Sequence, residues 1–303
     1  MKKSRLSTIL AAVGTVLVMV GLGVYFFYQQ QHFETPNELA KKFVQVNPST
    51  PPTILPELAT KSAKNKNASP AAQLSFADAN KQFGPCAVVP TLFYHHIQNL
   101  DQARVAGHAQ LTVGTQFFQK QMQYLQDHNY QPITMQQLIH FFNDGVALPK
   151  KPVLITVDDA YDDFGSDALP ILRAFHFPAT LFVPTGLVEN PGYLKWSTIA
   201  DAAGSNIYIA NHTWSHHGMA GAKSMIEREI TLAETQLHER GYDPAKVFAY
   251  PYGTTSPYAE SFLASQGFQV AFTTKFGATL CKKQRMELPR LRIGNSQLNL
   301  YGL

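Results

Sequence analysis

Two adjacent carboxylates, Asp158 and Asp159, follow directly on the apolar run Val153 to Val157. The run has the length and the β-branched content of a buried strand. Carboxylates at the end of a buried strand lose hydration, so they need hydrogen bonds, an opposite charge or a cation close by. An ordinary acidic loop is the alternative, and this segment alone leaves both interpretations open.

A second segment supplies nitrogen ligands. His212 and His216 follow the apolar run Ile207 to Ala210, and their spacing lets one tight turn present both imidazoles to the same point. With Asp159 they form the two-nitrogen, one-oxygen ligand set of an open catalytic zinc site. The sequence therefore predicts a divalent metal held by Asp159, His212 and His216. Zinc is favoured, and cobalt, nickel or manganese fit the same ligands.

Two more segments also follow predicted strands. In the segment from Ala249 to Gly253, proline and glycine predict an irregular turn whose backbone N–H groups can point inward, with a plain tight turn as the alternative. In the segment from Leu92 to His96, the adjacent residues His95 and His96 point to opposite faces, so only one can reach a cleft. All four segments lie at carboxyl ends of strands, which in a (β/α) barrel form the one face where active sites are built.

Short apolar runs alternate with longer amphipathic stretches after Pro85. Strands are predicted at 88–94, 153–157, 180–183, 207–210, 247–250, 270–273 and 288–293. Helices are predicted at 117–128, 135–144, 166–175, 225–240 and 257–265, with Thr134 as the N-cap of the second. Strands separated by helices predict an α/β fold with a mainly parallel sheet, either doubly wound or closed as a barrel.

Taken together, these motifs resemble those of the polysaccharide deacetylases of carbohydrate esterase family 4. The matching residues are Thr156-Val157-Asp158-Asp159, His212-Thr213-Trp214-Ser215-His216 and Tyr250-Pro251-Tyr252-Gly253. The resemblance spans roughly Cys86 to Leu303. It implies a distorted (β/α) barrel of about seven strands and a metal-dependent hydrolase that removes acetyl groups from an N-acetylated polysaccharide.

The resemblance also implies roles for individual residues. Asp158 would be the general base, Asp159, His212 and His216 would bind the metal, and the backbone N–H of Tyr252 would stabilise the oxyanion. The residues expected to contact the sugar are Trp196, Tyr250 and Pro251. For Trp196, packing in the core is an equally good alternative.

Two departures from the common family pattern point to one branch of it. The segment 291–294 offers no histidine as general acid, and Ala249 stands where most of the family has arginine. The poly-N-acetylglucosamine deacetylases, which resemble a circularly permuted form, carry that acid in a Tyr-His motif on the first strand. Tyr94-His95 matches this motif, so His95 is the expected general acid. A third departure, Ala160 in place of the usual glycine, would strain the turn after Asp158 if φ were positive there.

The N-terminal part predicts a membrane anchor. Leu6 to Tyr28 contains no charge, is long enough to cross a bilayer and follows Lys2, Lys3 and Arg5, which should stay cytoplasmic. Residues 1–28 are thus expected to be a single-pass anchor at the cell membrane, with the catalytic domain, residues 85–303, outside the cytoplasm. A cleaved signal peptide is the alternative. Residues 29–84, rich in Pro, Ser and Lys, are expected to form a flexible linker, although part of 71–83 could pack on the domain.

Composition limits the possible partners. The 25 Lys and Arg residues balance 21 Asp and Glu to a net charge of +4 and are scattered, so no nucleic-acid partner is expected. Cys86 and Cys281 could form a disulfide outside the membrane or remain free buried thiols. Two other functions stay open: a catalytically weak carbohydrate-binding protein, and an O-acetyl esterase acting on an acetylated polysaccharide.

Overall fold

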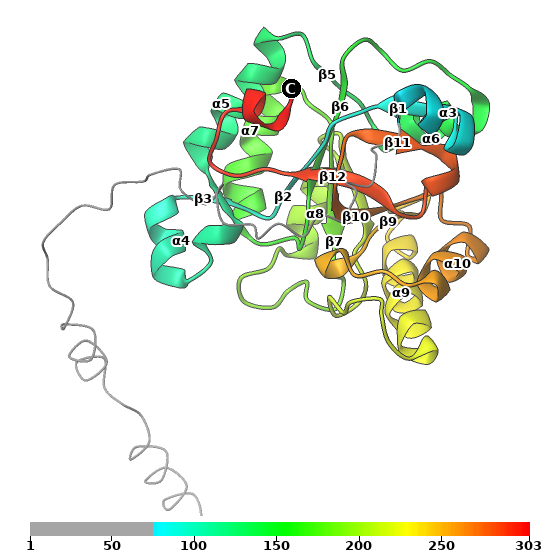
Figure 1. Cartoon of the computed structure of the whole chain (residues 1–303). Helices are drawn as coiled ribbons and strands as arrows, with labels where there is room; N and C mark the ends of the chain where they lie inside the picture. Colours follow the sequence, from blue (N-terminus) through cyan, green and yellow to red (C-terminus); the bar gives the residue numbers. More distant parts are fainter. Residues whose placement is uncertain (1–74) are drawn as a thin grey trace, which may run out of the picture. The chain divides into compact units, whose positions relative to one another are not determined.

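Seven parallel strands close into a barrel in the part of the chain that the computed structural model describes, residues 75–303 (Figure 1). The barrel closes because β2 pairs with β12 on one side and with β6 on the other. This confirms the predicted α/β fold and the barrel of about seven strands. In spatial order the strands are β2 (Thr91–Tyr94), β12 (Leu288–Arg292), β10 (Val270–Phe276), β9 (Val247–Ala249), β8 (Ile207–Asn211), β7 (Ala179–Val183) and β6 (Pro152–Val157).

The strand registers bring the predicted site segments to one end of the barrel. Tyr94 lies opposite Val157, so His95 and Asp158 leave adjacent strands at the same level. All residues of β6 except the first are buried, as expected for a parallel strand covered on both faces. Because parallel strands share a direction, the residues that follow them collect at the carboxyl end of the barrel.

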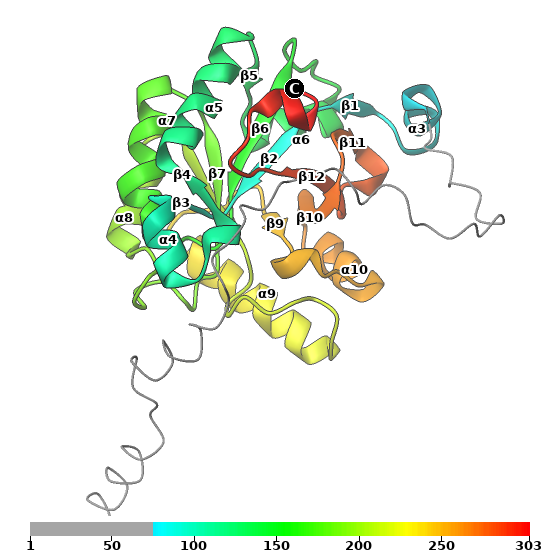
Figure 2. The ribbon, with the colours of Figure 1, turned by 60° about the vertical axis from the view of Figure 1, so that its left-hand side comes forward.

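Helices cover the outside of the barrel (Figures 1 and 2). Helix α5 packs against α7, and α9 packs against α10 and β8. The larger helices are α5 (Thr115–Asp127), α6 (Met135–Asp144), α7 (Leu169–Phe175), α8 (Trp196–Ala203), α9 (Lys223–His238) and α10 (Pro257–Ser265). The bounds predicted for α6 and α10 are confirmed, and Thr134 caps α6 in a capping box with Gln137.

Shorter elements fill the connections. Helix α4 (Leu100–Ala106) lies between the paired strands β3 (His96–Gln98) and β4 (Thr112–Gly114), and β5 (Gln131–Pro132) extends the sheet beside β6. The short helical turns are η1 (Ala109–Leu111), η2 (Phe164–Ala168), η3 (Pro251–Gly253), η4 (Lys282–Gln284) and η5 (Leu298–Tyr301).

Several elements differ from the sequence prediction, and for three of them the structure shows a local reason. The strand predicted at 88–94 is two strands, because the chain turns at Val89-Pro90 and β1 (Cys86–Val88) pairs instead with β11 (Thr279–Cys281). The helix predicted at 166–175 begins as the π-type turn η2. Helix α8 was not predicted, because only Ile199 and Ala202 of it are buried and no side chain caps it.

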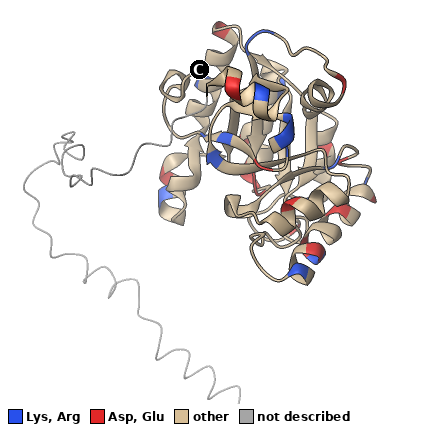
Figure 3. Ribbon diagram, turned by 45° about the vertical axis from the view of Figure 1, so that its right-hand side comes forward, with Lys and Arg blue, Asp and Glu red and all other residues tan. Residues whose placement is uncertain are grey.

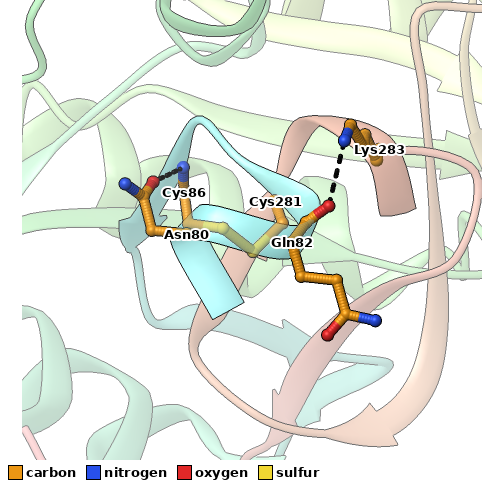
Figure 4. Close-up of a disulfide and its surroundings, with 5 residues drawn as sticks. All are labelled: Asn80, Gln82, Cys86, Cys281 and Lys283. Atoms are coloured by element: carbon orange, nitrogen blue, oxygen red, sulfur yellow. Dashed lines mark hydrogen bonds between the residues drawn. A yellow bond between two sulfur atoms is a disulfide. The ribbon is translucent and has the colours of Figure 1, made fainter. Parts of the chain in front are cut away.

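A disulfide joins Cys86 to Cys281, which face each other in the antiparallel pair β1 and β11. Figure 4 shows helix α3 (Phe76–Phe83) beside this bond. The Cys86 N–H donates to Asn80 Oδ1 at 2.7 Å, and Lys283 Nζ donates to the Gln82 carbonyl at 3.0 Å. Residues 76–83 thus pack on the domain, which is the alternative left open for this segment.

The predicted anchor, residues 1–28, and most of the predicted linker lie outside the described residues. Within residues 75–303, no helix combines the length and the apolar character needed to cross a membrane. In Figure 3, basic and acidic residues are interspersed along the helices of the side in view, in keeping with the small net charge of +4.

The disulfide closes a loop of 195 residues and should stabilise the domain mainly by restricting the unfolded chain. We expect the double substitution Cys86→Ser and Cys281→Ser to lower the free energy of unfolding by about 2–4 kcal/mol. Urea unfolding at equilibrium measures this, and wild type under a reductant is the matched control. Equal unfolding midpoints for the variant and the oxidised wild type would contradict it.

Candidate active site

The three metal ligands predicted from the sequence lie together at the carboxyl end of the barrel. Asp159 follows β6, His212 follows β8, and His216 comes one turn later. One ligand atom from each lies within 4.8 Å of the other two, and among residues 75–303 no other group of three His, Cys, Asp or Glu residues does this. Asp159 and His212 are buried, and His216 is partly exposed, so the group opens to solvent on the His216 side.

The donor atoms fit a divalent cation. Asp159 Oδ1 lies 2.9 Å from His216 Nε2 and 3.2 Å from His212 Nε2, yet this buried oxygen has no hydrogen-bond partner among the described residues. His212 Nδ1 donates to the Ala249 carbonyl at 2.8 Å, which leaves the lone pair of Nε2 facing Asp159. A buried oxygen and an imidazole lone pair aimed at the same point are what a bound cation requires.

The loop that carries both histidines is fixed from two sides. Asn211 Oδ1 accepts from the Thr213 N–H at 2.9 Å. Glu229, buried on α9, accepts from the Ser215 N–H at 2.7 Å and from its hydroxyl at 2.9 Å. Thr213 and His216 both have positive φ, so this loop holds strained backbone that these bonds must maintain.

Tyr252 lies next to a predicted ligand. Its φ is 59°, and its hydroxyl is 3.2 Å from His216 Nδ1. The following Gly253 also has positive φ, and a Cβ there would lie 2.0 Å from Thr274 Oγ1, so only glycine fits this close approach. The turn thus places the Tyr252 side chain beside His216, and the role of its backbone N–H as oxyanion donor stays a prediction.

Asp158, the predicted general base, forms a buried ion pair with Arg290 on β12. Its two carboxylate oxygens accept from the guanidinium at 2.8 and 2.7 Å. Burial by itself would raise the pKa of Asp158, but the charge and hydrogen bonds of Arg290 outweigh it and hold this pKa below its ordinary value. Asp158 is therefore ionised over the whole range of neutral pH, as a general base must be.

Arg290 is fully buried and fastened on several sides. Nε donates to the Thr273 carbonyl at 3.0 Å, and Nη1 donates to Thr156 Oγ1 at 3.1 Å. The guanidinium also lies 4.4 Å from the centre of the Phe93 ring. Arg290 was not predicted from the sequence, because the resemblance places the family arginine at the position of Ala249. The available signal was an arginine in the middle of the predicted strand 288–293.

The neighbouring histidines separate as their spacing predicts. His95 is close enough to Asp158 and Asp159 for both charges to act on it. His96 instead is buried, with Nδ1 2.5 Å from Asp163 Oδ2 and its ring stacked 3.7 Å from the Tyr161 ring. Of the two histidines, His95 is therefore the one that lies close to the predicted general base and the predicted metal ligands.

Ala160 occupies a left-handed backbone position with φ of 54°, directly after Asp159, whose φ is 76°. Alanine is unfavourable at a positive φ, so Ala160 strains the turn after Asp158 as expected for a residue that replaces glycine. The Ala160 side chain is buried in the main core cluster, and its carbonyl accepts from the Leu194 N–H at 2.9 Å. Core packing and this backbone bond hold the strained turn in place.

Two residues expected to contact the sugar do not face the site. Tyr250 is fully buried in the cluster with Phe248, and its hydroxyl donates to the Met286 carbonyl at 2.9 Å. Pro251 is also buried, and its carbonyl accepts from the Thr254 N–H. The prediction of sugar contacts was wrong for both side chains, because the turn points Tyr250 into the core and exposes Tyr252.

Trp196 lies at the start of α8, half-buried against the main core cluster. The guanidinium of Arg240, beyond the end of α9, covers its ring at 4.0 Å from the centroid. These contacts favour the packing alternative for Trp196 over a position in the sugar groove.

Two tyrosines beside Asp159 were also missed. Burial raises the pKa of Tyr161 and of Tyr193, and the charge of Asp159 adds to both shifts, so both side chains lie near that carboxylate. Their ring centres are 5.3 Å apart. The signal was present in the sequence, since Tyr161 follows the aspartate pair by two positions and Tyr193 is aromatic within a polar loop.

Known proteins share both the sequence pattern and the fold. Residues 145–271 match the family model described as polysaccharide deacetylase. The poly-beta-1,6-N-acetyl-D-glucosamine N-deacetylase of Escherichia coli K12 is 26% identical over 231 residues, which cover 61% of this chain and 34% of the relative. The enzyme of the same name from Staphylococcus epidermidis is 23% identical, covering 61% and 68%. The chain thus matches about a third of the length of the E. coli relative.

Two solved structures have the same fold. The Streptococcus pyogenes deacetylase PplD, in complex with acetate, aligns with a TM-score of 0.64 at 23% identity, over 69% of this chain and 93% of that one. IcaB from Ammonifex degensii aligns with a TM-score of 0.61 at 22% identity, over 68% and 91%. The Asp-Asp, His-x-x-x-His and Tyr-Pro-Tyr-Gly motifs lie around one end of such a barrel, and all three fall within residues 145–271, the segment that matches the polysaccharide deacetylase model.

Proposed function

We propose that this protein is a metal-dependent hydrolase that removes acetyl groups from an N-acetylated polysaccharide. One observation carries the proposal: Asp159 Oδ1 and two imidazoles face one point directly beside the ionised Asp158. Asp159 Oδ1 is buried there without a hydrogen bond from any described residue. When bound, a divalent cation, for which this ligand set favours zinc, would polarise the acetyl carbonyl and lower the pKa of a water.

Asp158 would accept the proton from the attacking water. Arg290 donates one hydrogen bond to each oxygen of Asp158, so both oxygens keep a free lone pair. The carboxylate can therefore still accept a hydrogen bond, and then a proton, from a water. Arg290 fixes the carboxylate in one orientation before substrate arrives. The backbone N–H of Tyr252, next to His216, would stabilise the negative charge that develops on the acetyl oxygen.

His95 would donate the proton that the departing amine needs. Burial lowers the pKa of His95 from its ordinary value of 6.5, while the charges of Asp158 and Asp159 raise it in part. Protonated His95 is therefore favoured on the acidic side of neutrality. The high-pH limb of the activity profile should lie at or below that of an ordinary histidine.

For the substrate, we propose a poly-N-acetylglucosamine of the kind that the named relatives act on. Peptidoglycan and chitin-like glucans are the competing N-acetylated polymers. Acetate release measured on each of the three polymers identifies the preferred N-acetylated substrate. Acetate release from an O-acetylated xylan would indicate the O-acetyl esterase instead. A protein that binds sugar without releasing acetate from any of them would be the catalytically weak alternative.

We further propose that the catalytic domain lies outside the cytoplasm, tethered by a single-pass anchor at 1–28. The uncharged run Leu6 to Tyr28 supports the anchor. The Cys86–Cys281 disulfide supports an oxidising compartment for the domain.

We expect Asp159→Ala and His212→Ala to lose both the bound metal and acetate release, because each removes one of three protein ligands. Elemental analysis of purified protein and an acetate assay measure the two effects. His217→Ala is the matched control, since His217 is exposed one position beyond the second ligand. Full metal content and full activity in either ligand variant would rule out this ligand set.

We expect Asp158→Asn to keep its metal and to lower turnover at least ~100-fold, the scale of losing a general base. The amide keeps the size of the carboxylate but neither its charge nor its basicity. Metal content and turnover, measured on the same preparation, separate binding from chemistry. Normal turnover in this variant would exclude Asp158 as the base.

We expect His95→Ala to lose the high-pH limb of the pH–rate profile while its metal content stays normal. Wild-type activity should fall as pH rises through the pKa of His95, because the acid loses its proton. Without His95 that fall should disappear and turnover should be low throughout. His96→Ala is the control, because His96 bonds to Asp163 and should change stability rather than this limb. An unchanged profile in His95→Ala would contradict the assignment.

A further inference from the structure

A second buried pair of aspartate and histidine lies just beyond the proposed base and acid. His96 Nδ1 is 2.5 Å from Asp163 Oδ2, and Asp163 Oδ1 accepts from the Ile97 N–H at 3.2 Å. Both side chains are buried, and neither takes part in the proposed reaction. A buried pair of this kind adds little net stability compared with apolar side chains of similar size, so stability alone does not explain its presence.

The barrel sheet pairs the two catalytic segments up to Asp158. Strands β2 and β6 end at Tyr94 and Val157, and the Asp158 N–H donates to the Tyr94 carbonyl at 2.9 Å. His95 and Asp159 lie beyond both strands, and Asp159 has a positive φ. Contacts further along the two segments must therefore set the distance between the proposed acid and the proposed metal ligand.

The His96–Asp163 pair supplies such contacts. Asp163 comes four positions after Asp159, whereas His96 and Ile97 directly follow His95. One carboxylate thus bonds the aspartate segment, residues 158–163, to a side chain and to the backbone of the histidine segment, residues 95–97. Two donors on one carboxylate fix its orientation as well as its position.

Ring stacking holds His96 in place. Tyr161, from the aspartate segment, lies nearly parallel to the His96 ring with the ring centres 3.7 Å apart. His108, which precedes η1, stacks on the His96 ring at 4.1 Å, and two rings this close must lie on opposite faces. The imidazole is therefore held between two aromatic rings, and its Nδ1 keeps its direction toward Asp163.

We propose that His96 and Asp163 are positioning residues, which clamp the segment of the general acid to the segment of the base and the metal ligand. The acid must lie within hydrogen-bond reach of the departing amine while Asp158 acts on the attacking water. A displacement of about 1 Å between such groups can lower the rate roughly a hundredfold. This inference rests on the proposed deacetylase function and adds two residues that act through their neighbours.

The test compares Asp163→Ala, which removes both bonds, with Asp163→Asn. The amide can still accept from the Ile97 N–H and donate to a neutral imidazole. On soluble oligomers of β-1,6-linked N-acetylglucosamine at saturating metal, we expect Asp163→Ala to lower kcat about 10–100-fold with little change in KM, because the reacting groups are displaced. Asp163→Asn should recover most of this loss.

A second readout needs no activity. Asp159 belongs to the clamped segment, so the Asp163→Ala protein should bind Zn²⁺ about tenfold more weakly than wild type. Competition with a chromogenic chelator measures this affinity, and Asp163→Asn should bind nearly as tightly as wild type. If thermal unfolding shows that Asp163→Ala does not fold, Asp163→Ser takes its place, because the shorter side chain cannot reach both partners.

Phe142→Ala is the matched control for a loss of stability alone. Phe142 is fully buried on α6 and shares a core cluster with Val89 and Leu154, near the amino ends of β2 and β6. This end of the barrel is opposite to the proposed site. The variant should lower the unfolding midpoint and leave kcat and Zn²⁺ affinity of the folded protein unchanged.

Wild-type kcat or wild-type Zn²⁺ affinity in folded Asp163→Ala would overturn the clamp, and so would equal losses in Phe142→Ala. Failure of Asp163→Asn to recover would also overturn it, because charge rather than position would then matter. If metal-loaded wild type released acetate from no substrate, the proposed function would fail separately. The Zn²⁺ affinities would then decide, with weaker binding in Asp163→Ala and recovery in Asp163→Asn as support and equal affinities as refutation.

Discussion

The buried ion pair between Asp158 and Arg290 is the interaction on which the rest of the site depends. A guanidinium with no solvent exposure is tolerated inside the barrel only because carboxylate, carbonyl, hydroxyl and aromatic partners surround it. The pair joins β12 to β6 across β2, the strand that closes the barrel and leads to His95. The charge of the predicted base and the closure of the fold are therefore maintained by the same contacts.

Strained backbone concentrates where the chemistry is proposed. Among residues 75–303, five of the twelve non-glycine residues with positive φ lie in the three turns that surround the ligand set: Asp159, Ala160, Thr213, His216 and Tyr252. Such conformations persist only when surrounding structure enforces them. Glu229 does this for the histidine loop, and the Leu194 bond to Ala160 does it for the aspartate turn. The scaffold thus stabilises a geometry that the local sequence alone would not adopt.

Patterns local in sequence predicted the barrel strands, the bounds of α6 and α10, and the convergence of Asp159, His212 and His216. These features depend on periodicity, caps and the common direction of parallel strands. Arg290, Glu229 and Tyr193 were missed because their roles arise from contacts between segments distant in sequence. Tyr250 was misplaced because motif membership does not say which way a side chain leaves a turn. The anchor, residues 1–28, remains a prediction.

A double-mutant cycle on Asp158 and Arg290 tests the dependence of the site on this pair most directly. Arg290→Met alone should lower the free energy of unfolding by about 3–5 kcal/mol, because it leaves Asp158 buried without a partner. Arg290→Met combined with Asp158→Asn should cost much less than the sum of the two single changes, since no buried charge is then unpaired. Denaturant unfolding of the four proteins gives the coupling energy. Additive single effects would contradict the account.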